Sequence, residues 1–303
     1  MKLLKELCEI HAPSGEEKPV RDFLINYFQK NKNLFKSEPE LIYGEDFQDC
    51  LIVKFGKPRT VVFAHMDSIG FTVRYDNQLV PIGGPVAENG FALVGEDSLG
   101  PVACELKESE TGHLFYDFGR GIDRGTSLTF ACDFKEDDDF VQSCYLDNRL
   151  GVYNAIKVAE TLKDGVIAFS CWEEHGGGTV PFLLQYCYEK YQVKNALISD
   201  ITWITEGVRH GEGVAISMRD RNVPRRSFID KIIEIAKKHK VPFQLEVEGG
   251  GSSDGREVQQ SPYPVDWCFV GAPEDNVHSP TEKVHKADIA AMIKLYQILM
   301  KEL

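Results

Sequence analysis

Histidines and carboxylates follow a series of apolar runs in this 303-residue chain. Short, continuous apolar runs are typical of strands buried on both faces of a sheet. The polar residues concerned are His65 and Asp67 after VVFA, Asp147 after CYL, Glu173 and Glu174 after VIAFSCW, Asp200 after ALIS, and His278 on a longer loop after CFV. Ligands bind beyond the carboxyl ends of strands in open α/β sheets. We therefore expect these side chains to converge on one crevice.

The residue types in this set predict a pair of divalent metal ions. Clustered carboxylates repel one another strongly unless a cation neutralises them. Imidazole and carboxylate ligands without thiolate suit Zn, Co or Mn, and one carboxylate can bridge two ions that share a water. The pair Glu173-Glu174 offers one ligand and one proton-transferring base. Asp67 is placed to orient the imidazole of His65. Each residue alone also has a structural explanation, such as helix capping by Asp147, so the prediction depends on their coincidence.

The elements that position these residues alternate between strands and helices. This alternation predicts an α/β fold with a mixed, mostly parallel sheet and helices on both faces. Residues 71–140 instead show short alternating runs between Gly, Pro and Asp turns, which predicts a small inserted all-β domain. The catalytic domain would then be discontinuous, formed by residues 1–70 and 141–303. Near the N-terminus, Ser14 and Glu17 form a capping-box pattern that predicts a helix starting after Ser14.

Charge and cysteine usage restrict the partners and the compartment. The chain has 34 Lys and Arg against 47 Asp and Glu, a net charge of −13. This balance argues against nucleic acid and anionic membranes as partners. The eight cysteines show no C-x-x-C spacing and are expected to be free thiols in a reducing compartment. No apolar run approaches the length of a membrane span, and charges interrupt the N-terminal segment. We expect a cytoplasmic protein.

Seven motifs occur in the same order along this chain as in a known family. The first is APSGEE (12–17). The other six are AHMDSIGF (64–71), YLDNRLG (145–151), WEEHGGG (172–178), SDIT (199–202), GGGSSDG (249–255) and NVHSP (276–280). The family comprises the tetrahedral, glutamyl and deblocking aminopeptidases, which are cytosolic dinuclear metallopeptidases of clan MH, some of them labelled endoglucanases. The resemblance covers essentially the whole chain.

The resemblance implies a metallo-aminopeptidase that hydrolyses N-terminal residues from peptides through a water activated by two metal ions. It implies that Asp147 bridges the ions, that Glu173 is the general base and that Asp67 orients His65. The remaining implied ligands are His65, Glu174, Asp200 and His278. It also implies that the inserted domain mediates dimerisation within a large homo-oligomer whose sites face an enclosed space.

Three positions depart from the family pattern. Asn148 stands where a second aspartate is usual, and His175 replaces a small apolar residue after the Glu pair. His175 is expected to be structural or solvent-exposed. The loop GGGSSDG differs from the usual Gly-Gly-Thr-Asp, so Asp254 is expected to shape the loop or to face the substrate. The insertion is also short for the family.

Other functions fit the same residues. A related metal-dependent deacylase or carboxypeptidase would use the same ligand set. A catalytically inactive homologue would bind a peptide or partner without turnover, although such proteins usually lose ligands or the base. A true endoglucanase would use paired carboxylates without metal. The basic concentration at residues 209–226 could receive an acidic residue, but we expect it to be solvated or at an interface.

Overall fold

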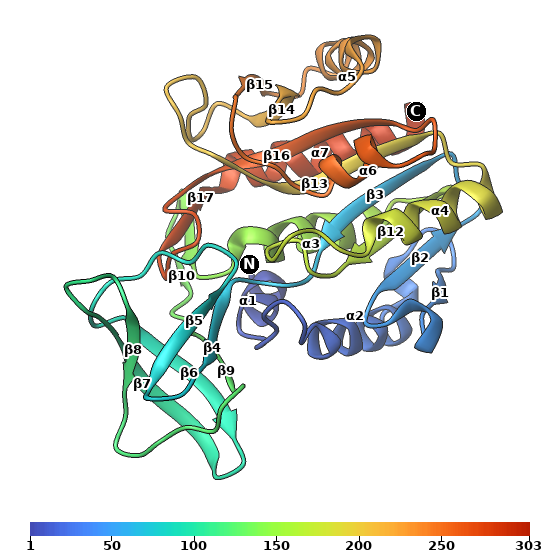
Figure 1. Cartoon of the computed structure of the whole chain (residues 1–303). Coiled ribbons are helices and arrows are strands. Elements are labelled where there is room, and N and C mark those ends of the chain that lie inside the picture. Colours follow the sequence, from blue (N-terminus) through green and yellow to red (C-terminus); the bar gives the residue numbers. More distant parts are fainter.

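The computed structural model describes residues 1–303 and contains an 11-stranded sheet and a separate closed barrel (Figure 1). The sheet has the order β1-β2-β12-β3-β13-β16-β17-β11-β10, and β14 with β15 joins it beside β16. Its strands are β1 (Glu40–Ile42), β2 (Leu51–Phe55), β3 (Thr60–His65), β10 (Lys135–Glu136), β11 (Phe140–Ser143), β12 (Gly165–Ser170), β13 (Asn195–Trp203), β14 (Val214–Arg219), β15 (Phe243–Val247), β16 (Asp266–Asp275) and β17 (Glu282–His285).

The centre of the sheet is parallel, and antiparallel strands flank it. Strands β12, β3, β13 and β16 are consecutive parallel neighbours, and β3 and β12 are buried along their whole length. These strands are the apolar runs of the sequence, because a strand covered on both faces needs apolar side chains on both. Their carboxyl ends lie at one edge, where Ser170 of β12 is in register with His65 of β3. The predicted fold class is confirmed.

Helices cover both faces of the sheet. Helices α3 and α7 contact each other on one face, and α4 and α6 contact each other on the other. No helix is long and apolar enough to cross a membrane. The helices are α1 (Lys2–Cys8), α2 (Lys18–Lys30), α3 (Leu146–Ala159), α4 (Val180–Tyr191), α5 (Arg226–Lys238), α6 (Gly255–Gln260) and α7 (Lys286–Glu302), with short 3-10 turns at Lys32–Leu34 and Glu45–Phe47.

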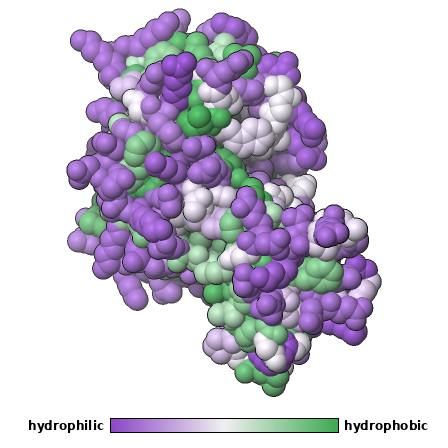
Figure 2. All heavy atoms as spheres, turned by 90° about the vertical axis from the view of Figure 1, so that its left-hand side faces the viewer, coloured by the Kyte–Doolittle hydropathy of each residue, from purple (hydrophilic) through white to green (hydrophobic).

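The barrel is built from six antiparallel strands and projects from the body as a narrower lobe (Figures 1 and 2). It has a core of its own with 14 buried residues, centred on Phe71, Leu128 and Phe130, whereas the body buries 67 apolar residues together. The strands are β4 (Gly70–Val73), β5 (Gln78–Ile82), β6 (Ala92–Asp97), β7 (Gly100–Glu108), β8 (Leu114–Asp117) and β9 (Ser127–Phe130).

Two local features bear on the sequence predictions. Helix α2 begins at Lys18 with Glu17 as its N-cap residue, and no side chain caps it. The predicted capping role of Ser14 is therefore wrong, because its hydroxyl is instead drawn into a hydrogen bond with Asp67. All eight cysteines are free thiols, and all except Cys132 are buried.

Candidate metal centre

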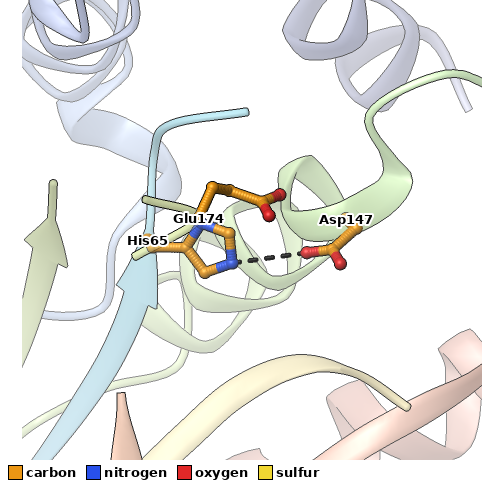
Figure 3. Close-up of side chains that lie close together, drawn as sticks. All are labelled: His65, Asp147 and Glu174. Atoms are coloured by element: carbon orange, nitrogen blue, oxygen red, sulfur yellow. Dashed lines mark ion pairs between the residues drawn. The ribbon is translucent and has the colours of Figure 1, made fainter. Parts of the chain in front are cut away.

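The structure brings all five predicted metal ligands to the carboxyl edge of the parallel strands. His65 ends β3, Asp200 lies in β13, and Glu174 follows β12. Asp147 is in the first turn of α3, and His278 lies on the loop between β16 and β17. The ligand atoms of His65, Asp147 and Glu174 lie within 4.8 Å of one another (Figure 3).

Asp147 lies between the two histidines. Its Oδ1 is 3.3 Å from Nε2 of His65, and its Oδ2 is 3.3 Å from Nε2 of His278. A second carboxylate accompanies each histidine: Oδ2 of Asp200 is 3.4 Å from His65 Nε2, and Oε2 of Glu174 is 3.0 Å from His278 Nε2. The cluster thus divides into two halves, each with one imidazole and one carboxylate, which share Asp147.

Asp67 is fully buried behind the His65 half. Its Oδ1 lies 3.4 Å from Nδ1 of His65 and also accepts the backbone N–H of Glu173 at 3.1 Å. Its Oδ2 accepts the backbone N–H of Glu174 at 3.1 Å and the hydroxyl of Ser14 at 2.6 Å. Asp67 therefore lies beside the imidazole of His65 and also fixes the backbone of the Glu pair, which the sequence did not indicate.

Glu282 and Gly84 position the His278 half. Glu282 is fully buried, and its carboxylate accepts the backbone N–H of Asp147 at 3.1 Å and that of His278 at 2.9 Å. The imidazole Nδ1 of His278 lies 3.1 Å from the carbonyl oxygen of Gly84, on the segment between β5 and β6. Donation from Nδ1 to this carbonyl leaves Nε2 free to bind a metal ion. Sequence analysis missed both residues.

Buried carboxylates outnumber the histidines in the cluster, and this imbalance shifts the pKa values of its members. Burial disfavours protonation of His65, but Asp200, Asp147 and Asp67 outweigh it and hold the His65 pKa well above its usual value. Burial also opposes protonation of His278, whose pKa is nevertheless raised to about 12 by Asp147 and Glu174. Burial and the charge of Asp147 raise the pKa of Glu174 to about 7.

These residues fit a bound divalent metal. Oε1 of Glu174 is buried without any hydrogen-bond partner, so a lone pair in the cluster is unsatisfied. Buried charges need a partner or a metal to offset the loss of hydration. Imidazole nitrogen and carboxylate oxygen are borderline ligands that suit Zn, Co or Mn. Nδ1 of His278 lies 3.1 Å from the carbonyl oxygen of Gly84, and Nδ1 of His65 lies 3.4 Å from Oδ1 of Asp67. An oxygen atom beside the second ring nitrogen is typical of metal-binding histidines.

The three departures from the family pattern have structural explanations. Asn148 donates to the carbonyl of Ser199 at 2.9 Å and accepts the backbone N–H of Gly151 at 2.8 Å, so it ties α3 to β13. His175 lies outside the cluster, and its Nδ1 accepts the backbone N–H of Gly83 at 2.9 Å. Asp254 is buried and accepts the hydroxyl of Ser170 at 2.5 Å.

A cavity of about 290 Å³ opens beside the cluster. Asp147, Glu174, Asp200 and His278 line it, together with Glu173. Oε2 of Glu173 is 3.9 Å from Nε2 of His65. Burial and neighbouring carboxylates raise the pKa of Glu173 well above its usual value, although His65 opposes this. The cavity therefore presents the cluster and one further carboxyl group to a bound molecule.

Comparisons with known proteins agree with this architecture. The model of the M42 glutamyl aminopeptidase family matches residues 118–295. A protein of Acetivibrio thermocellus that carries an aminopeptidase name is 26% identical over 330 residues, covering 97% of this chain and 96% of its own length. The chain belongs to the M42 glutamyl aminopeptidase family, which confirms the resemblance and the prediction of a metal-dependent aminopeptidase.

Solved structures share the whole fold. An aminopeptidase from the archaeon Desulfurococcus kamchatkensis superposes with a TM-score of 0.87 at 22% identity, covering 100% of this chain and 94% of that one. The TET1 peptidase of Pyrococcus horikoshii, which can assemble into a tetrahedron or a large octahedral shell, gives a TM-score of 0.82 at 22% identity, with 100% and 99% coverage. At these identities the similarity establishes the fold.

Proposed function

We propose that this protein removes N-terminal residues from peptides with two divalent metal ions held by His65, Asp147, Glu174, Asp200 and His278. The position of Asp147 carries the proposal, since its two carboxylate oxygens face different histidines at 3.3 Å each. A carboxylate in that position can serve two ions at once. His65 with Asp200 would complete one binding position, and His278 with Glu174 the other.

The ions, when bound, would polarise the scissile carbonyl and make a water a stronger acid near neutral pH. Glu173 would accept the proton of the attacking water and deliver it to the leaving nitrogen. It belongs to neither half of the cluster but lines the same cavity. Its backbone N–H is held by Asp67, which fixes the main chain from which the carboxyl group extends. Glu173 therefore has the location that a general base requires.

The variant Glu173→Gln tests this assignment. We expect full metal content but a loss of turnover of about 10²–10⁴-fold, the usual contribution of a general base. Glu234→Gln is the matched control. Glu234 is exposed on α5, so its substitution removes the same charge at a position away from the cavity. Near-wild-type turnover of Glu173→Gln would remove Glu173 from the base role.

Metal identity and reaction class can be tested together. The protein is stripped with a chelator, and Zn, Co or Mn is added back separately before aminoacyl anilides and N-acyl amino acids are assayed. We expect restored cleavage of the anilides only. Preferential cleavage of the N-acyl compounds would instead support a deacylase, and metal binding without any turnover would support an inactive peptide-binding homologue.

We further propose that residues 1–70 and 141–303 form the catalytic unit, together with β10 of the same sheet, and that the barrel within residues 71–140 mediates homo-oligomer formation in the cytoplasm. The barrel exposes apolar side chains, among them Leu99, Val80 and Tyr75. Exposed apolar side chains are common at protein interfaces. Light scattering after size-exclusion chromatography should give a mass above that of one chain, and Leu99→Lys should lower it. A monomeric wild-type protein would contradict this assignment.

A further inference from the structure

We propose, on the basis of the aminopeptidase function above, that the cavity selects peptides whose first residue is lysine or arginine. The cavity extends from the cluster to a wall formed by β13, β15 and the loop at 248–254. The first residue of a peptide has to lie beside the cluster for its peptide bond to be cut. Its side chain would therefore lie against this wall.

Glu246 is the central feature of the wall. It lies on β15, only 4% of it is exposed, and it lines the cavity. One of its oxygens accepts the hydroxyl of Thr202. Two further carboxylates, Asp220 and Glu248, line the same cavity. A buried carboxylate without a cationic partner is unfavourable, and a cationic side chain entering the cavity would relieve this cost.

The rest of the wall is also short of positive charge. Its one arginine, Arg256, lies 3.3 Å from the carboxylate of Glu257, and there is no lysine. Asp220 of the stretch at residues 209–226 lines the cavity, but none of the arginines of that stretch does. Arg209, Arg219 and Arg221 are exposed. Arg225 pairs instead with Asp266, and Arg226 pairs with Asp230 at 2.7 Å. On the wall away from the metal ligands, an acidic first side chain would therefore meet carboxylates and only the paired Arg256.

The shape and the apolar atoms of the cavity suit a long side chain with a charge at its end. The cavity volume of about 290 Å³ is at the small end for ligand pockets. Its three hydrophobic lining residues are Ile201, Trp203 and Phe269. Trp203 is 47% exposed, so its ring is available to an aliphatic stem or to a cation above its face. Lysine and arginine combine such a stem with a cationic head.

An adjoining cavity adds one more buried carboxylate beside the first cavity. This second space of about 350 Å³ shares Trp203 and His278 with the first and is lined by Glu274. Glu274 is 1% exposed, and neither of its carboxylate oxygens has a hydrogen-bond partner. An unsatisfied buried carboxylate on a second side of the same crevice also favours a cationic ligand. The two cavities together therefore present negative charge to a peptide whose first residue is cationic.

Four aminoacyl anilides test the proposal on the metal-loaded full-length protein: lysyl, arginyl, norleucyl and glutamyl. Norleucine keeps the aliphatic stem of lysine but lacks its charge, so the ratio of kcat/KM for lysyl over norleucyl isolates the cation. We expect this ratio to be about tenfold or more, since hydrogen bonds to buried charged groups are among the strongest. The glutamyl substrate should be the poorest of the four.

The variant Glu246→Gln should reduce the lysyl-to-norleucyl ratio by about tenfold, whereas Glu234→Gln should leave it unchanged. If Glu246→Gln does not fold, product inhibition of the wild-type enzyme tests the same preference for a cation. The proposal predicts that free L-lysine inhibits at lower concentration than L-norleucine. A ratio near one, or a preference for the glutamyl substrate, would overturn the proposal. Cleavage of none of the four substrates would instead contradict the aminopeptidase function.

Discussion

The two halves of the metal cluster differ in how they are built. The His65 half lies on strands of the parallel sheet, and the side chain of His65 is 1% exposed. The His278 half lies on a loop, and the side chain of His278 is 27% exposed. A buried Asp67 stands behind His65, whereas a carbonyl of the barrel segment, that of Gly84, stands behind His278.

The difference indicates separate roles for the sheet and the barrel. Parallel pairing places His65 beside Ser170 and Asp200 beside Gly271, so both residues are held by strands of the body. The His278 half also depends on the segment at residues 83–86, where the backbone N–H of Val86 donates to the carbonyl of His278 at 2.9 Å. A movement of the barrel would therefore reach the His278 half through this segment.

The largest effect is expected from Asp147→Asn, which alters the residue that the halves share. Removal of its charge takes one ligand from both positions, so both ions should be lost and cleavage should fall to the background of the assay. Metal analysis by mass spectrometry together with the anilide assay measures this. A variant that loses only one ion would show that the other half holds its ion without the charge of Asp147.

A stepwise loss of metal is expected from the wild-type protein during titration with a chelator. The more exposed His278 half should release its ion first, because ligand access and a loop scaffold both favour dissociation. His278→Ala should retain one ion and abolish the first step, whereas His65→Ala should remove the slower step. Release of both ions in a single step would contradict the proposed difference between the halves.

A smaller effect is expected from Glu282→Gln, which weakens the support behind His278 and Asp147. Loss of such supporting contacts typically costs about 10–100-fold in metal affinity or activity. Because Glu282 holds the backbone of both residues, the affinity of the first-released ion should fall most. Calorimetric titration of the stripped protein with Zn measures the two affinities. Equal weakening of both would indicate that Glu282 acts on Asp147 alone.

The sequence predicted the fold and the residues that point into the cluster, because apolar strands precede most of these residues. It did not predict Glu282, which lies in a short polar stretch and contacts a residue 135 positions away. Glu246 is likewise hidden, since one acidic residue in the run FQLEV resembles the exposed face of a strand. Burial of such residues is decided by tertiary packing, and local spacing carries no signal for it.

Ser14 shows the same limit and gives the smallest predicted effect. Its spacing from Glu17 is that of a capping box, yet its hydroxyl donates to Asp67 at 2.6 Å. Asp67 keeps its bonds to the backbone of Glu173 and Glu174 when the hydroxyl is removed. Ser14→Ala should therefore lower kcat by about tenfold, the low end of the range for a hydrogen bond to a charged group. Thermal stability should fall little, because the start of the helix does not use this side chain.

Ser227→Ala, on the exposed surface of α5, is the control for Ser14→Ala. A drop in melting temperature with unchanged kcat would return Ser14 to a purely structural role.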